Sequence, residues 1–96
     1  MILEHALLSV KPGEGAAFEA AMAKARPLIA ASPGFRSMAV RKACESPDRY
    51  LLLAEWDDIA SHRDGFRTSA RYREWRALLH PFYDPMPTVS YFGEPL

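Results

Sequence analysis

The side chains best suited to acid-base chemistry gather in one stretch of this chain, between the leucine-rich segment 51–54 and a loop that begins at Pro81. Among the side chains there that carry an imidazole or a guanidinium group, the candidates are His62, Arg67, Arg76 and His80. Imidazole titrates near neutral pH and can accept a proton, whereas guanidinium keeps a positive charge that can orient an acidic or phenolic group. The flat aromatic side chains of the same region are Trp56, Phe66, Tyr72 and Trp75. This combination indicates a pocket for a small aromatic molecule.

Another histidine, His5, lies near the start of the chain in a segment rich in leucine and isoleucine. Because side chains alternate across a strand, His5 should point away from the face that carries Leu8 and Val10. An imidazole held rigidly among leucines and shielded from water is a suitable general base. We therefore predict His5 as the catalytic base, with His62 or Arg67 as the partner of a developing oxyanion.

Each candidate also has a purely structural interpretation. His5 can be a hydrogen-bonded histidine of the core or the sheet edge, and His62 can be solvated or paired with a carboxylate on a helix surface. Trp56 can fill the core at a strand end, while Tyr72 and Trp75 have the spacing of a buried helix stripe. Arginines on helices mostly form a solvated face. Both interpretations stay open at this point.

The signatures of several other chemistries are missing. The sequence has no glycine-rich phosphate loop, no nucleophile elbow, and no His-x-x-x-His or Cys-x-x-Cys pair. Nucleotide, serine-hydrolase and zinc chemistry therefore find no support, and we predict no metal site. The single cysteine, Cys44, has no evident base beside it, so we interpret it as a strand residue.

The composition is that of a small protein without net charge. Its 96 residues suffice for one domain, residues 1–96, and 49% of them are hydrophobic. Twelve basic residues balance twelve acidic ones, so we expect neither nucleic acid nor a membrane surface as a partner. One cysteine cannot form an internal disulfide, and Glu4 interrupts the apolar start that a secretion signal would have. These features predict a cytoplasmic protein.

Hydrophobic periodicity divides the chain into elements that position the candidate residues. Strands are predicted at 2–10, 35–44, 49–56 and 86–92. Helices are predicted at 13–31, 59–66 and 69–80, and Pro27 is expected to kink or break the first of them. Asp57 or Asp58 should cap the second helix. Thr68 or Ser69 should cap the third.

The predicted order β-α-β-β-α-β is the ferredoxin-like α+β fold, an antiparallel sheet with helices on one face. The strands are apolar on both faces, since leucines stand at odd and even positions alike, as Leu7 and Leu8 do. Several hundred Å² of apolar sheet left in water would forgo on the order of 10 kcal/mol. We therefore expect a homodimer in which two sheets face each other and help to enclose a site for a small-molecule substrate.

Several parts of the chain form one pattern. They are Glu55-Trp56-Asp57 at the end of the third strand, His62 in the next helix, the segment from Phe66 to Trp75, and Pro87-Thr88-Val89-Ser90-Tyr91-Phe92. This pattern resembles the antibiotic biosynthesis monooxygenase domain over essentially the whole chain. The resemblance implies a dimeric α+β barrel. In several branches it also implies oxidation of electron-rich aromatic compounds, such as quinols or anthrones, by O₂ without metal or flavin.

The resemblance also bears on cofactors. One branch of the family degrades haem with an asparagine on the first strand, a tryptophan on the helical segment and a histidine that ligates iron. His5, Phe66 and Arg76 stand at these positions here, and arginine does not ligate iron as imidazole does. We therefore expect no cofactor, although His80 lies one turn beyond Arg76.

The principal hypothesis is a cofactor-independent monooxygenase that oxidises a small aromatic, quinol or polyketide-like substrate with O₂. Deprotonating a phenol-like substrate in a dry pocket makes it a better electron donor, so the protein need supply only a base, an oxyanion partner and apolar walls. Substrate-binding roles are predicted for Trp56, Phe66, Tyr72, Trp75, Arg76 and His80. The alternatives are a non-catalytic small-ligand-binding or regulatory dimer, and an isomerase or decarboxylase-like enzyme that uses the same pocket.

Overall fold

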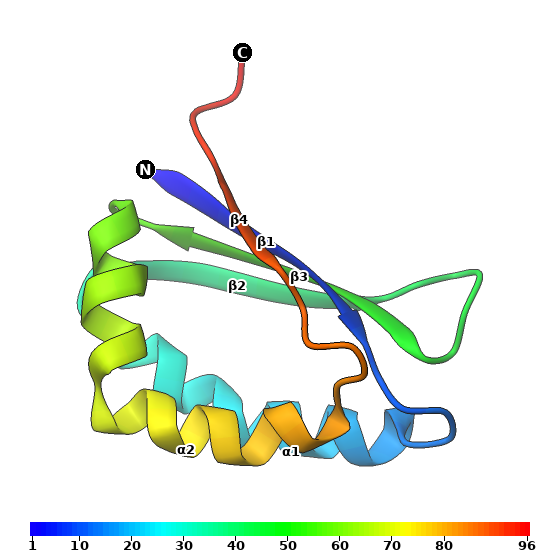
Figure 1. Ribbon diagram of the computed structural model, residues 1–96. Coiled ribbons are helices and arrows are strands. Elements are labelled where there is room, and N and C mark those ends of the chain that lie inside the picture. The colour runs from blue at the N-terminus through cyan, green and yellow to red at the C-terminus, as the bar shows by residue number, and fades with distance from the viewer.

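One layer of helices lies against one sheet in the computed structural model, which describes all residues 1–96 (Figure 1). The strands are β1 (Ile2–Ser9), β2 (Phe35–Lys42), β3 (Arg49–Trp56) and β4 (Val89–Phe92). The α-helices are α1 (Gly15–Ala30) and α2 (Ala70–Leu79). The short helical turns are η1 (Ser61–Gly65), η2 (Phe66–Thr68) and η3 (His80–Phe82). This order confirms the predicted ferredoxin-like α+β fold.

All neighbouring strands are antiparallel, and their order across the sheet is β2-β3-β1-β4. β2 and β3, which follow each other in the chain, pair as an antiparallel hairpin. In the interior strand β1, Glu4 stands opposite Ala54 of β3 and opposite Tyr91 of β4. Side chains that stand directly opposite each other lie on the same face of a sheet. Glu4, Ala54 and Tyr91 therefore share one face, the face toward the helices.

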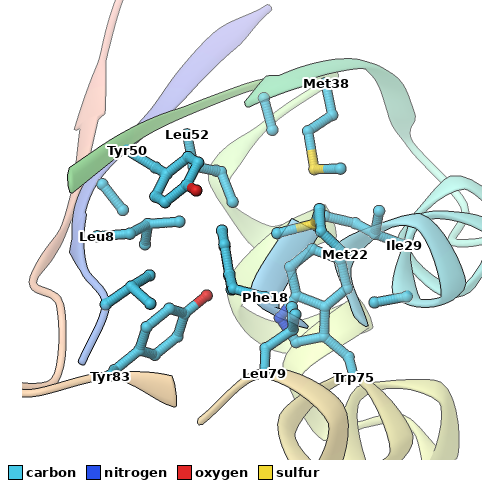
Figure 2. Packing of buried hydrophobic residues seen from close by; sticks show 14 of the residues in the cluster. Leu8, Phe18, Met22, Ile29, Met38, Tyr50, Leu52, Trp75, Leu79 and Tyr83 are labelled. Atoms are coloured by element: carbon cyan, nitrogen blue, oxygen red, sulfur yellow. The ribbon is translucent and has the colours of Figure 1, made fainter. Parts of the chain in front are cut away.

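The hydrophobic core fills the space between the sheet and the helices (Figure 2). Phe18 of α1, Leu79 of α2 and Leu8 of β1 meet there, and each is at most 2% exposed. Burial alternates along β1, because Leu7 is 54% exposed between buried neighbours. The strands therefore use one apolar face for the core and leave the other face of the sheet without helices.

Helix α1 continues through Pro27 to Ala30, so a break at this proline is wrong. Pro27 has no N–H and removes the partner of the Ala23 carbonyl, but it stands near the end of the helix, where few further bonds depend on it. On either side of it, Ala25 and Ile29 are 0% and 1% exposed. Their burial in the core holds the last turn in helical form.

The segment predicted as a helix over 59–66 is helical but irregular, with a π-helical turn at η1 and a 3₁₀ turn at η2. Asp58 begins it by accepting a hydrogen bond from the Ser61 N–H at 2.8 Å. Ser69 caps α2 by accepting one from the Tyr72 N–H at 3.2 Å. The structure thus selects Asp58 and Ser69 from the predicted caps. π-Helical turns are rare and occur often at functional sites, and this one carries His62.

Some strand ends differ from the prediction. β2 ends at Lys42 rather than at residue 44, and β1 ends at Ser9, after which Val10 forms an isolated bridge to Tyr83. β4 begins at Val89 rather than at residue 86. Pro87 has no N–H to donate to a neighbouring strand, which explains the late start of β4.

Gly34 turns the chain from α1 into β2 and packs against the start of η1. Its φ is +85°, and a Cβ at this position would collide with the Ser61 side chain. We expect Gly34→Ala to lower the free energy of unfolding by about 2 kcal/mol or more, because strain and collision add. Urea unfolding measures this loss.

Gly13→Ala is the matched control for this substitution. Gly13 has a similar φ of +80°, but a Cβ there would meet no atom within 4 Å. Its replacement should therefore cost about 1–2 kcal/mol, from the left-handed backbone alone. Equal losses for the two variants would contradict the proposed collision with Ser61.

Candidate active site

A cavity of about 310 Å³ lies between the sheet and the second helical region. On the sheet side it is lined by Glu4, Ala6, Leu8, Leu52 and Val89. On the helical side it is lined by His62, Arg67, Tyr72, Trp75 and His80. The loop before β4 adds Tyr83, Met86 and Pro87. The size and the mainly apolar lining suit a small aromatic ligand.

Glu4 lies at one end of the cavity and is only 5% exposed. The Nε1–H of Trp56 donates a hydrogen bond to Glu4 Oε1 at 3.0 Å. The Nε2 atom of His62 lies 3.4 Å from Glu4 Oε2, and His62 is itself 4% exposed. A carboxyl group is costly to bury and is rarely found inside without partners. This pair therefore stands out from the rest of the core.

The second nitrogen of His62 contacts a tyrosine. Nδ1 lies 2.6 Å from the hydroxyl oxygen of Tyr91 on β4. The rings of Trp56 and Phe66 lie 5.2 and 6.2 Å from the imidazole, centroid to centroid. The imidazole is thus fixed in orientation, and a connected polar path runs from Glu4 through His62 to Tyr91.

Burial shifts the pKa values of Glu4 and His62 in opposite directions. It raises the pKa of Glu4, against the lowering effects of the Trp56 hydrogen bond and the Arg67 charge. Burial, assisted by the positive charge of Arg67, lowers the pKa of His62 to about 4. His62 is therefore neutral at pH 7, with a proton on one ring nitrogen and a lone pair on the other. Its contact with Glu4 is a polar contact of a neutral imidazole rather than an ion pair.

Arg67 brings a positive charge to the same end of the cavity from η2. Besides acting on Glu4 and His62, it helps to lower the pKa of Tyr91, although burial and the Glu4 charge raise that pKa overall. Its guanidinium carbon lies 5.8 Å from the centre of the Tyr72 ring. None of the ion pairs in the structure involves Arg67. Its positive charge is therefore not neutralised by an ion pair and can act on an oxyanion of a bound ligand.

The other end of the cavity is aromatic. The ring of His80 lies 6.3 Å from that of Tyr72 and 5.8 Å from that of Tyr83, between centroids. Trp75 and Tyr83 are 8% and 7% exposed. Burial and the charges of Arg76 and Arg67 lower the pKa of His80, so this imidazole is also neutral at pH 7.

The structure brings many of the predicted site residues together. Those that line the cavity are His62, Arg67, Tyr72, Trp75 and His80. Trp56 and Phe66 are buried behind His62 and do not line it. Arg76 lies outside, in a shallow depression next to the cavity. His5 lies on the opposite face of the sheet, as its alternation predicted, with its ring 5.7 Å from that of Phe92.

Sequence reasoning missed Glu4, Tyr83 and Tyr91. Glu4 gave a usable signal, because it alternates with Ala6 and Leu8 on the face that enters the core. A carboxyl group on a strand face that enters the core is rare, so its presence marks a candidate functional residue. The contact of Tyr91 with His62 depends on the pairing of β4 with β1, which no local pattern reveals.

No group of three or more His, Cys, Asp or Glu side chains is placed to hold a metal ion. Cys44, predicted as a strand residue, lies just beyond the end of β2 as an exposed free thiol. None of the helices has both the length and the apolar character needed to cross a membrane.

The lowered pKa of His62 predicts how stability depends on pH. The folded value of about 4 lies below the ordinary 6.5, so the unfolded chain binds this proton more readily. The contribution of His62 to the free energy of unfolding should therefore be complete above pH 6.5 and be lost as the pH falls to about 4. Glu4 acts in the opposite sense, because its raised pKa favours the folded state below 4.5 and this gain is lost at higher pH.

Two measurements check this prediction. Urea unfolding at several pH values should show a steeper loss toward pH 4 in the wild type than in His62→Gln, which lacks the titrating ring. NMR of the imidazole carbons should show His62 neutral well below pH 6.5. Protonation of His62 near its ordinary pKa would contradict the buried geometry described above.

Comparison with known proteins places this fold and cavity in a family. The antibiotic biosynthesis monooxygenase family matches residues 1–78. The uncharacterized protein YczJ of Bacillus subtilis is 44% identical over 98% of this chain and 99% of its own length. A crystal structure of a Bordetella bronchiseptica protein assigned to the antibiotic biosynthesis monooxygenases is 37% identical, with a TM-score of 0.93 over 99% of this chain and 97% of that one.

A more distant structure has the same fold. SnoaB of Streptomyces nogalater, a cofactor-independent oxygenase, superposes with a TM-score of 0.86 over 99% of this chain and 93% of its own. Its identity to this chain is 18%, so this likeness concerns the fold alone. The family match and the 37% identical Bordetella bronchiseptica structure support the assignment. The chain belongs to the antibiotic biosynthesis monooxygenase family.

Proposed function

We propose that this protein is a cofactor-independent monooxygenase that oxidises a small aromatic, quinol or polyketide-like substrate with O₂. The observation that carries the proposal is the buried pair of Glu4 and His62 at one end of an aromatic cavity. Membership of the monooxygenase family supports the type of reaction. The cofactor-independent oxygenase SnoaB provides a precedent for this chemistry on the same fold.

The base in this proposal is the Glu4–His62 pair rather than His5 alone. A carboxylate with a raised pKa is a stronger base than an exposed one, and it is closer to the acidity of a phenolic substrate. His62, neutral and held through Nδ1 by the Tyr91 hydroxyl, can receive the proton from Glu4 on Nε2 if that nitrogen carries the lone pair. Arg67 would stabilise the resulting oxyanion.

The oxygen chemistry then needs no further group from the protein. The deprotonated substrate, for example an anthrone as its phenolate tautomer, reduces O₂ and forms a C–O bond to give a hydroperoxide after protonation. Loss of water breaks the O–O bond and leaves a carbonyl. In sum, a ring CH₂ and O₂ become C=O and H₂O. Tyr72 and Trp75 would hold the flat rings, and Trp56 and Phe66 would support His62 from behind.

His5 belongs to a second proposed surface, the uncovered face of the sheet. Leu7 and Phe92 on this face are 54% and 52% exposed. Leu51 stands opposite Leu7 and Leu53 opposite His5 in the register of β1 and β3. An apolar stripe of this kind fits a second copy of the same sheet, so we propose a homodimer through this face. His5 would then lie between the two sheets.

Oxygen uptake with a panel of quinols and anthrones tests the function. Glu4→Gln removes the carboxylate while keeping its shape, and it should lower the rate about 100-fold, the scale for losing a general base. His62→Gln should lower the rate similarly. Glu74→Gln is the matched control, because Glu74 is an exposed carboxyl on α2 outside the cavity, and it should keep the wild-type rate.

Two results would decide against this proposal. A large loss of rate in His5→Ala with little change in Glu4→Gln would place the base on the other face of the sheet. Tight aromatic binding without oxygen uptake by the wild type would favour a ligand-binding protein. Near-ultraviolet circular dichroism of each variant checks that the aromatic core is intact.

Sedimentation equilibrium tests the homodimer. The wild type should sediment as a dimer at micromolar concentration, and Leu7→Glu should shift it toward the monomer, because two buried like charges would face each other near the interface. Ala20→Glu adds the same charge on the exposed side of α1 and should leave the dimer intact. A monomeric wild type would contradict the proposed interface.

A further inference from the structure

A shallow depression on the surface of α2 adjoins the cavity. This depression is lined by Arg73, Arg76 and Ala77 of α2, with His80, Pro81 and Met86. His80 and Met86 also line the cavity. A ligand seated among the aromatic rings can therefore extend past His80 without leaving a lined surface.

The depression carries positive charge that no protein carboxylate neutralises. Arg73 and Arg76 are exposed and stand one turn apart on the same side of α2. Neither takes part in an ion pair, whereas Arg36 and Arg63 elsewhere on the surface each pair with an aspartate. The chain as a whole has no net charge, so the positive charge in this depression is a local excess.

The two ends of the site differ in chemistry and would bind different parts of a ligand. Glu4 and Leu8 both line the cavity, and four residues of a strand span about 13 Å. The proton-accepting Glu4–His62 pair and the aromatic rings line the cavity, and Arg73 and Arg76 line the depression that adjoins it at His80 and Met86. A molecule that satisfies all three has a flat ring system with a hydroxyl at one end and an anion at the other.

We propose that the substrate is an aromatic carboxylic acid, whose rings occupy the cavity and whose carboxylate is held by Arg73 and Arg76 at its mouth. The inference rests on the proposed function in that it uses the same cavity. Guanidinium groups match the planar carboxylate through paired hydrogen bonds. The positive charge of Arg76 already acts on His80, which lies between the rings and the depression. The carboxylate would therefore also fix which end of the substrate reaches Glu4.

Binding of two matched probes tests this inference independently of any reaction. 2-Naphthoate and 2-naphthamide have nearly the same shape, but only the first carries a charge, and neither has a hydroxyl to be oxidised. Isothermal titration calorimetry at low salt should show naphthoate binding at least about tenfold more tightly, which corresponds to 1.4 kcal/mol. The preference should weaken as salt is added, because the arginines are exposed.

Variants locate the source of the preference. Replacing Arg73 and Arg76 together by glutamine should abolish most of the preference for naphthoate and leave the affinity for naphthamide unchanged. Arg49→Gln removes one exposed arginine at the start of β3, outside both the cavity and the depression, and it should keep the preference. Both positions on α2 are exposed, so these variants should fold normally.

The possible outcomes separate this inference from the proposed function. Equal affinity for the two probes, binding of neither, or an equal loss in Arg49→Gln would overturn the carboxylate site. A protein that oxidises neutral quinols without preferring naphthoate would overturn the inference and retain the monooxygenase. A protein that prefers naphthoate but consumes no oxygen with any aromatic acid or quinol would retain the carboxylate site and overturn the monooxygenase.

Discussion

The burial of the Glu4 carboxyl is the constraint on which the rest of the site depends. A carboxyl that is 5% exposed loses the hydration it has in an unfolded chain, and its burial is tolerable only if nearby groups replace the lost water. Trp56 supplies an N–H, and His62 lies beside the second oxygen. Each partner comes from a different element, so the pair forms only when the sheet and the helical connection are both in place.

The register of the sheet decides whether this arrangement exists. Ile2 stands opposite Trp56, so Glu4 is the diagonal neighbour of Trp56 on the same face. A slip of β1 by one residue would turn Glu4 to the uncovered face and bring His5 toward the helices. The apolar alternation of Ala6 and Leu8 prevents this slip, because both are 2% exposed in the core. Hydrophobic packing thus fixes the position of a polar group that the core alone would exclude.

The fold could be predicted from the sequence because its signals are local. Short hydrophobic segments predicted the strands, and Asp58 and Ser69 mark two helix starts through hydrogen bonds within a few residues. The helical side of the site could also be predicted from the sequence, since His62 and Arg67 lie in one short segment. The contacts of Glu4 with Trp56 and of Tyr91 with His62 join residues 52 and 29 positions apart. Only the tertiary structure brings such pairs together.

The same strand serves both proposed surfaces because its side chains alternate. Glu4 faces the cavity while His5 and Leu7 face the uncovered side, so consecutive residues of β1 take part in different interactions. The sheet and the second helical region of this chain line opposite sides of the cavity. A second copy on the other face would instead cover the back of β1 and keep water from the sheet beneath Glu4. Association would then support the site by holding β1 rigid.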